Sequence, residues 1–241
     1  MIPVHLYGHP LDPTRLQALA EEYDVAMIED CAQSAGAVRA ERPTGTAGAA
    51  AATSLYPTKN LGAMGDGGVL LTSDEAIAEH ARRLRDYGQS SRYQHVEVGL
   101  NSRLDELHAA VLRSAMLPRL DRWLHRRREI ATRYTDALAD SPLKPILAAD
   151  GNSAHHLFPV EATHVPAAEV VEALARAGVT AGRHYPRLCP EQPAAQGLGE
   201  SLDELTVARR IAERELSLPI HPYLQEDELE RVIEACLETC G

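Results

Sequence analysis

Two polar clusters follow apolar runs directly, at positions where parallel sheets bind their ligands. The first cluster is 28–34 (IEDCAQS), in which Asp30 closes an apolar run, and the second is 53–60 (TSLYPTKN), which contains Lys59. In open α/β sheets ligands lie outside the carboxyl ends of the strands, so Asp30 is placed where a ligand would be. The alternative is that Asp30 only caps a turn, and this segment by itself leaves that alternative open.

Lys59 has a setting that an ordinary surface lysine lacks. A lone lysine in a loop is usually just an exposed side chain. Here the hydroxyl of Ser54 lies five positions earlier, an apolar strand pattern precedes it, and the glycine-rich segment 62–68 follows. Glycines of this kind let the backbone approach a ligand closely or adopt positive φ. The pattern therefore favours a functional lysine.

The glycine-rich segment does not fit a nucleotide-phosphate loop. It is followed by the strand pattern Val69–Thr72, whereas a P-loop or a dinucleotide fingerprint opens a helix whose N-terminus holds the phosphate. A generic NAD-binding domain is excluded for the same reason.

Charge and cysteine content narrow the classes of partner and site. The formal net charge is -11, with 24 Lys+Arg against 35 Asp+Glu, so electrostatic attraction to nucleic acid or to an anionic membrane is not expected. The beginning of the chain resembles neither a signal peptide nor a membrane span. The four cysteines form no CxxC pair and no disulfide framework, so we expect a cytoplasmic protein without a metal site; they are Cys31, Cys189, Cys236 and Cys240.

The elements that must position these residues alternate between strand and helix patterns. We expect a helix at 13–23, with Asp12 as its N-cap, and a helix to about 85 that is capped by the segment 73–75 (Ser-Asp-Glu). Strands are expected at 2–7, 25–29, 49–55 and 68–72. This alternation predicts an α/β layer structure with a mostly parallel sheet. A further helix is expected from 102–105 onward, with a kink or break at Pro118. A solvated, arginine-rich linker helix is expected over 119–133.

The second half of the chain predicts a small α+β domain. The acidic, proline-bearing segment 143–151 is the expected boundary. We therefore predict a large domain at 1–118, a linker helix and connection at 119–150 and a small domain at 151–241. Its expected strands are 156–160 and 179–181, and its expected helices are 167–177, 202–215 and 226–237.

Taken together, these segments resemble the nucleotide-sugar aminotransferases of the DegT/DnrJ/StrS group, which are fold-type I enzymes dependent on pyridoxal phosphate (PLP). The resembling segments occur in the family's order: PVHLYG at 3–8, IEDCAQ at 28–33, SLYPTKNLGAMGDGG at 54–68, GLNSRLDEL at 99–107 and HYP at 184–186. The resemblance implies that Lys59 forms the Schiff base with PLP and that Asp30 bonds the pyridine nitrogen. An anionic carboxylate keeps that nitrogen protonated, which makes the ring an electron sink.

The same resemblance implies further roles around the cofactor. Gln33 bonds its phenolic oxygen, Ala32 packs on a ring face and Ser54 donates to the phosphate. Asn101 reaches the phosphate of a neighbouring subunit, which implies a homodimer with a shared site. The alternative for Asn101 is a helix N-cap beside Ser102.

His184, Tyr185 and His221 belong to segments that resemble the family's rim over the active site, and structural roles are the alternative for each. The implied reaction is transamination of a nucleotide-linked keto sugar, with an amino acid, glutamate, as donor. Family members carry about a third of their length before the PVHLYG strand, so we expect a truncated chain. The competing hypothesis is a non-catalytic remnant, or a subunit of a split enzyme that needs a partner chain.

Overall fold

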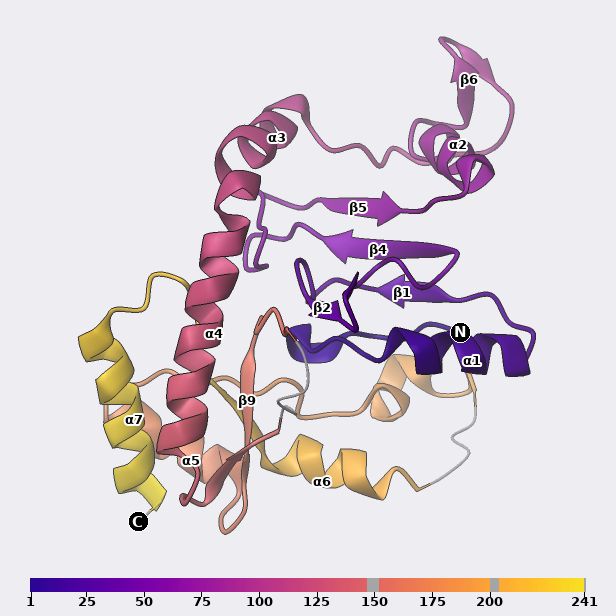
Figure 1. Ribbon diagram of the computed structural model, residues 1–241. Helices are drawn as coiled ribbons and strands as arrows, with labels where there is room; N and C mark the ends of the chain where they lie inside the picture. Colours follow the sequence, from indigo (N-terminus) through magenta and orange to yellow (C-terminus); the bar gives the residue numbers. More distant parts are fainter. Residues whose placement is uncertain (147–151, 200–203, 241) are drawn as a thin grey trace. The chain divides into compact units, whose positions relative to one another are not determined.

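The computed structural model describes residues 1–146, 152–199 and 204–240 (Figure 1). The chain forms two compact units. Unit 1 comprises Met1–His125 and a short segment that ends at His156, and unit 2 comprises the rest. The first division thus falls inside helix α4 (Leu120–Ala137), whereas our sequence boundary was at residue 118.

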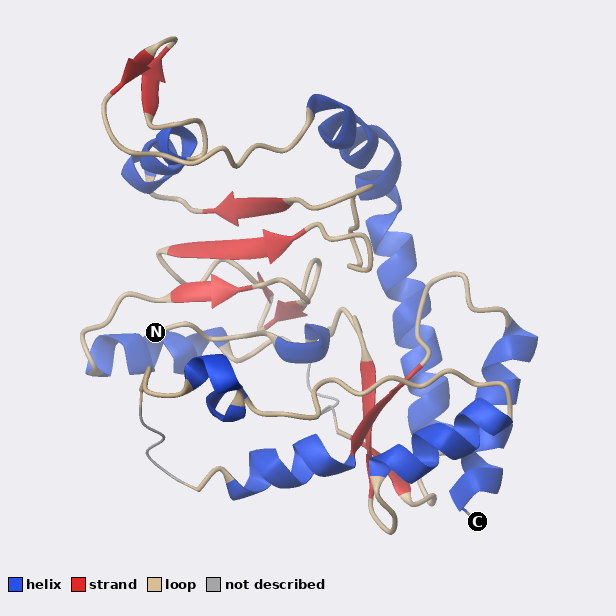
Figure 2. Cartoon of the chain, turned by 180° about the vertical axis from the view of Figure 1, so that it is seen from behind, coloured by secondary structure: helices blue, strands red, loops and turns tan. Residues whose placement is uncertain are grey.

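Unit 1 is organised around a three-stranded sheet, visible from both sides in Figures 1 and 2. Its order is β1-β4-β5. Strand β1 (Ile28–Asp30) runs parallel to β4 (Ala50–Ser54), and β4 runs antiparallel to β5 (Gly68–Leu71). The fold-type I α/β class is confirmed by the solved structures compared below, and the parallel pairing lies on the β1 side of the sheet.

Two expected strands are shorter than predicted. Over 2–7 only Val4 forms a bridge, parallel to Asp30. The chain then turns at Leu6–Gly8, where Tyr7 has φ 62° and Gly8 has φ 89°. Apolar patterning cannot reveal such a turn.

Strand β1 also begins later than the expected 25–29. The backbone N–H of Val25 still donates to Ala20 O, and Asp24 has φ 48°. The exit from the preceding helix therefore occupies the residues where the strand was expected to start.

The two expected N-terminal helices are present with the predicted caps. Helix α1 (Pro13–Glu22) is capped by Asp12 and helix α2 (Glu75–Leu84) by Asp74, and each aspartate accepts from two backbone N–H groups. Unit 1 also contains two small hairpins that the sequence did not predict. They are β2 (Val38–Arg39) with β3 (Arg42–Pro43), and β6 (Gln89–Ser91) with β7 (Gln94–His95).

The long central helical region begins later than predicted and is irregular around Pro118. Helix α3 (Glu106–Val111) is followed by a π segment at Leu112–Met116 and a 3-10 turn at Leu117–Arg119 before α4 begins. The predicted break at Pro118 is confirmed, because the ring removes a backbone donor from the helix.

The prediction that 119–133 is solvated holds for only one face of this helix, where Arg122 and Arg133 are exposed; the other face is buried. Arg127 is only 6% exposed, and its guanidinium donates to Ile220 O at 3.0 Å. Ile130 and Tyr134 of the same helix are fully buried in unit 2. The arginine density misled the prediction, since a guanidinium can be buried where carbonyl groups accept from it.

Unit 2 combines an antiparallel sheet with helices. The sheet order is β10-β9-β8, from β8 (Leu143–Pro145), β9 (Phe158–Ala162) and β10 (Glu215–Leu218). Its helices are α5 (Ala167–Arg176), α6 (Thr206–Arg214) and α7 (Glu226–Cys240), with 3-10 turns at Cys189–Glu191 and Pro193–Ala195.

Several expectations for unit 2 need correction. The segment at 143–146 that we took as part of a boundary contains β8, and 147–151 lie outside the described residues. The expected strand at 179–181 is replaced by a single bridge between Gly182 and Ser217. Glu215, expected at the end of a helix, is the first residue of β10.

The apolar side chains are distributed unequally. Among the described residues, unit 2 has one large buried cluster, which includes Phe158, Leu174 and Leu216, whereas unit 1 has two small ones. One face of the unit 1 sheet, which we call the exposed sheet face, carries Val4, Ile28, Ala52 and Leu70, of which Ile28 is 47% and Leu70 48% exposed. Among the described residues, no helix has the length and apolar character needed to cross a membrane.

Candidate active site

A pocket opens where the parallel strands β1 and β4 end. Asp30 is the last residue of β1, and Ser54 is the last residue of β4. The pocket has a volume of about 380 Å³. It is lined by Ile2, Ile28, Glu29, Asp30, Ala32, Ala52, Thr53, Ser54 and Gly67. Three of the predicted site residues, Asp30, Ala32 and Ser54, are therefore together.

Asp30 is held firmly by its surroundings. Its backbone N–H donates to Pro3 O at 2.9 Å, and its carbonyl accepts from His5 N at 3.1 Å. Its Oδ1 accepts from Ala32 N at 2.9 Å. The turn-capping contact that we considered as the alternative is thus present, and the same carboxylate also lines the pocket.

Lys59 lies on the connection from β4 to β5 and is half-buried. Its backbone N–H donates to Tyr56 O at 2.9 Å, which closes a turn. Burial lowers the pKa of the Lys59 amine, and the negative charge of Asp30 opposes this shift. A lowered pKa increases the fraction of neutral amine, which is the nucleophilic form.

The glycines after Lys59 allow the chain to approach itself. A Cβ on Gly62 would lie 2.5 Å from Pro57 O, so a side chain there would displace the turn that carries Lys59. None of Gly62, Gly65, Gly67 and Gly68 has positive φ. Of the two roles that we expected for these glycines, positive φ is therefore not observed, and close approach to a ligand stays a prediction; at Gly62 the close approach is to the backbone of the chain itself.

Asn60 supports the lysine turn in a way that sequence reasoning missed. It is 7% exposed. Its Nδ2 donates to Ala154 O at 2.7 Å, and its Oδ1 lies 3.3 Å from His156 Nδ1. The partners are more than 90 positions away in sequence, so no local pattern could have revealed this contact.

Ser54 and Gln33 are each partly engaged by the backbone. Ser54 Oγ accepts from Tyr56 N at 3.2 Å, so its hydroxyl hydrogen can still be donated to a ligand. Gln33 Oε1 accepts from Tyr7 N at 2.5 Å, so its Nε2 is the donor end. Gln33 and Lys59 are not among the residues that line the pocket.

Asn101 is exposed and is not a lining residue either. It forms a backbone bridge with Asp86. Helix α3 begins at Glu106 with Asp105 at the cap position, so the alternative role of Asn101 as a helix cap is wrong. Its role toward a neighbouring subunit stays a prediction.

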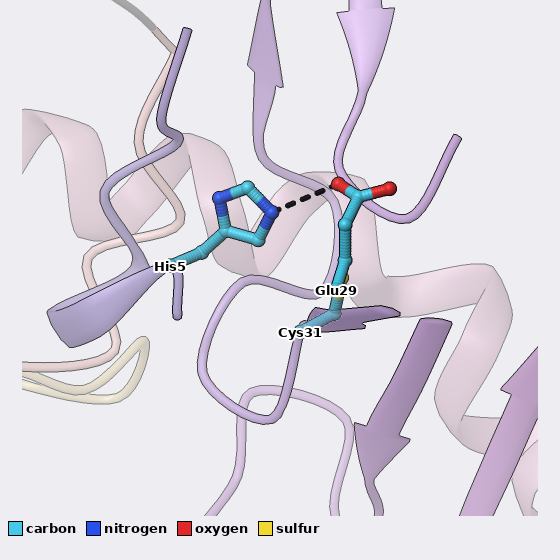
Figure 3. A group of neighbouring side chains, drawn as sticks. All are labelled: His5, Glu29 and Cys31. Atoms are coloured by element: carbon cyan, nitrogen blue, oxygen red, sulfur yellow. Dashed lines mark hydrogen bonds and ion pairs between the residues drawn. The ribbon is translucent and has the colours of Figure 1, made fainter. Parts of the chain in front are cut away.

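Beside Asp30, on the other face of β1, Glu29 forms a buried polar network with His5 (Figure 3). Both side chains are 2% exposed, and His5 Nε2 lies 3.0 Å from Glu29 Oε2. Glu29 also accepts from Gly45 N, Ala47 N and Gly48 N at 2.7–3.0 Å. Burial alone would raise the pKa of Glu29, but these hydrogen bonds outweigh it and lower the pKa, so the group is a buried anion.

His5, Glu29 and Cys31 have the spacing of a metal site, but their atoms already serve other contacts. His5 Nδ1 accepts from Leu11 N at 3.1 Å, which places the ring proton on Nε2, facing Glu29. Burial raises the pKa of the Cys31 thiol to about 11, so it stays protonated at neutral pH. The arrangement is suited to hydrogen bonding within the protein rather than to metal binding.

The three predicted rim residues lie in unit 2. His184 is half-buried, and its Nδ1 lies 3.0 Å from Ser217 Oγ. Tyr185 is 50% exposed, and His221 is also exposed. These positions do not test whether the three residues contact a substrate, so their roles stay predictions.

Comparisons with known proteins agree with this geometry. Over 97% of this chain, it is 42% identical to the erythromycin biosynthesis sensory transduction protein EryC1 of Saccharopolyspora erythraea, covering 63% of that protein. Over 99%, it is 41% identical to the dTDP-3-amino-3,4,6-trideoxy-alpha-D-glucose transaminase of Streptomyces venezuelae, covering 62% of it. The chain therefore spans less than two thirds of the length of these relatives.

The solved structures give the fold and the class. The crystal structure of S. venezuelae DesV in complex with a ketimine intermediate superposes with a TM-score of 0.91 at 41% identity, over 98% of this chain and 64% of that one. A DegT DnrJ EryC1 StrS aminotransferase from Brucella abortus gives a TM-score of 0.93 at 34% identity, over 100% and 64%. The fold and the pocket thus define a fold-type I aminotransferase architecture. The family model of the DegT/DnrJ/EryC1/StrS aminotransferases matches residues 1–237, and the chain belongs to that family.

Proposed function

We propose that the protein catalyses PLP-dependent transamination of a nucleotide-linked keto sugar, with an amino acid, glutamate, as the donor of the amino group. The observation that carries the proposal is the geometry at the ends of β1 and β4. The Asp30 carboxylate and the Ser54 hydroxyl line one pocket there. Burial lowers the pKa of Lys59, whose amine also interacts electrostatically with Asp30. The family membership supports the same chemistry.

The residues present fit PLP by the chemistry of their donor set. Asp30 would hold the ring nitrogen, Ser54 the phosphate, Gln33 the phenolic oxygen, and Ala32 would contact the ring. When bound, PLP supplies the electron sink for the carbanion formed during amino transfer. Asp30 would supply the negative charge that keeps the ring nitrogen protonated, and its carboxylate is already oriented by the hydrogen bond from Ala32 N. Lys59 supplies the amine that carries the cofactor and moves a proton to and from the substrate carbon.

The chain permits an unusually direct test of Lys59. Its only two lysines are Lys59 and Lys144. Lys144 is exposed and donates to Ala139 O at 2.6 Å, so it is a natural control for non-specific reaction. Incubation with PLP, reduction with borohydride and peptide mapping should place the stable adduct on Lys59.

Two variants sharpen this test. Lys59→Ala should abolish the visible absorption of the PLP complex, whereas Lys144→Ala should leave it unchanged. Equal labelling of the two lysines in the native chain would contradict the proposed role of Lys59.

Asp30→Asn tests the electrostatic part of the proposal. Asparagine keeps the size of the side chain and its oxygen toward Ala32 N but removes the charge. We expect PLP to bind with a modest loss of affinity and the rate of amino transfer to fall far more. Equal losses in binding and rate would instead assign Asp30 a purely structural role.

The substrate and the assembly belong to the same proposal. His184, Tyr185 and His221 are candidates for substrate contacts, and Asn101 for a phosphate contact in a homodimer. The relative named a dTDP-amino-sugar transaminase supports a nucleotide-linked sugar as the substrate class.

The exposed sheet face favours a second candidate: a subunit that works only with a partner chain, or a non-catalytic remnant. Exposed apolar sheet faces commonly mark interaction sites. Titration of the isolated chain with PLP separates the two candidates. Stoichiometric binding that is lost in Lys59→Ala would refute the remnant, whereas binding only after a companion chain is added would support the split enzyme.

A further inference from the structure

His184 is held by two groups of the neighbouring strand β10. Its backbone N–H donates to Glu215 Oε2 at 2.7 Å, and its ring Nδ1 lies 3.0 Å from Ser217 Oγ. Glu215 is fully buried and Ser217 is 4% exposed. Both partners are therefore shielded from water, and the imidazole is oriented by the protein.

The hydrogen bonds between these groups have one consistent direction. The Ser217 hydroxyl donates to Glu215 Oε1 at 2.6 Å, and Glu215 Oε2 accepts the backbone N–H of His184. Both oxygens of the Glu215 carboxyl thus accept from the protein, which is the pattern of a carboxylate. Because the single hydrogen of Ser217 is directed to Glu215, Ser217 Oγ is the acceptor in its contact with His184, and Nδ1 must carry the ring proton.

Gly182 also restricts the position of the His184 ring. Gly182 and Ser217 exchange backbone hydrogen bonds at 2.8 and 3.0 Å. A Cβ on Gly182 would lie 2.6 Å from His184 Cε1. The ring therefore occupies the space that any other residue at position 182 would fill.

We propose that Glu215, Ser217 and Gly182 are positioning residues that hold His184 as the Nδ1–H tautomer, in which Nε2 carries the lone pair and is the ring atom that can accept a hydrogen bond, such as one from a hydroxyl group of a sugar. The relevance to the substrate rests on the proposed function, whereas the tautomer itself does not. A histidine side chain in water favours the opposite tautomer, with the proton on Nε2. The arrangement therefore predicts that His184 adopts the tautomer that is the minor one in water.

The charged groups around the ring are compatible with this state. Burial raises the pKa of Glu215, and the hydrogen bonds from Ser217 and the His184 backbone, together with the positive charge of Arg183, oppose this rise without cancelling it. Arg183 itself donates to the carbonyl groups of Ala212 and Glu213. Burial also lowers the pKa of His184, which favours the neutral ring.

Nitrogen NMR of the full chain labelled at histidine tests the tautomer directly. The His184 signal is assigned by its loss in His184→Gln. In the native chain we expect the proton on Nδ1, and in Ser217→Ala we expect most of the signal to move to the Nε2–H form. Ser141→Ala removes another buried hydroxyl of unit 2, which contacts only backbone carbonyl and N–H groups of 138–143, and should leave the His184 signal unchanged.

Two further variants keep the test decisive. Ser217→Thr retains the hydroxyl and should restore the Nδ1–H form, and Gly182→Ala should disturb the ring without removing any hydrogen-bonding group. An Nε2–H signal in the native chain, or an unchanged signal in Ser217→Ala, would overturn the inference. Because this readout needs neither PLP nor turnover, its result is independent of the borohydride test, and either proposal can fail alone.

Discussion

The two units of this chain are stabilised by different means. In unit 2, side chains from α4, α5, α7 and the β8–β10 sheet meet in one apolar cluster that contains most of its large hydrophobic residues. In unit 1, the apolar clusters are small, and buried hydrogen bonds through Glu29, His5 and Asn60 join segments distant in sequence. The unit that carries the candidate cofactor pocket thus depends on polar contacts with defined direction, which fix the positions of individual side chains more strictly than apolar packing does.

The largest effect should come from removing a central side chain of unit 2. Phe158 is 2% exposed, and its ring centroid lies 5.1 Å from that of Tyr134. Phe158→Ala should lower the free energy of unfolding by about 3–5 kcal/mol, because it removes apolar burial and leaves a cavity. Urea unfolding followed by circular dichroism measures this, with Val98→Ala, at a position 95% exposed, as the control.

The next largest effect should come from the polar network of unit 1. Glu29→Gln keeps the shape but places an amide donor against backbone N–H groups, so we expect a loss of about 1–3 kcal/mol. A loss near zero would contradict the view that unit 1 depends on this buried anion.

The same variant has a pH signature whose sign is fixed by the lowered pKa of Glu29. A carboxylate with a lowered pKa contributes stability above its unfolded pKa of about 4.3, and this contribution disappears as the pH falls through the lowered folded value. The difference in unfolding free energy between the native chain and Glu29→Gln should therefore be constant near neutral pH and shrink on acidification below about pH 4.3.

A smaller effect is expected from surface charge in unit 2. Arg133 forms ion pairs with Glu226 and Glu230, and all three side chains are roughly half exposed. Glu230→Ala should change the unfolding free energy by about 0.2–1 kcal/mol, because solvent screens such pairs. The same urea experiment at low and high salt should show the difference shrinking as salt is added.

The smallest effect on stability should come from the exposed sheet face. Leu70 is 48% exposed, so Leu70→Thr should change the unfolding free energy by no more than about 0.5 kcal/mol. Light scattering should detect less self-association, because an apolar contact surface has been made more polar. A loss as large as that of Phe158→Ala would mean that this face is covered in solution.

Local signals in the sequence predicted part of this architecture well. Asp12 and Asp74 cap the helices they were expected to cap, because capping depends on residues within one turn. Asp30 and Ser54 line one pocket. Their positions could be predicted because apolar runs in the sequence show where the strands end.

What could not be predicted depends on contacts between distant segments. Asn60 is held by Ala154. Glu215, which accepts the backbone N–H of His184, begins strand β10 although it was predicted to end a helix. Arg127 was taken as solvated because its carbonyl partner lies 93 positions away. In each case the deciding interaction has no trace in the neighbouring residues.

Strand β1 also places two acids side by side in sequence and on opposite faces of the sheet. The buried one, Glu29, needs four donors, which only one alignment of the neighbouring segments supplies. A slip of the strand by one residue would exchange the faces of the two carboxylates, so that the shorter side chain of Asp30 would face the four donors and Glu29 would leave them. The network of the glutamate is therefore tied to the observed register of β1, the same register that directs the aspartate into the pocket.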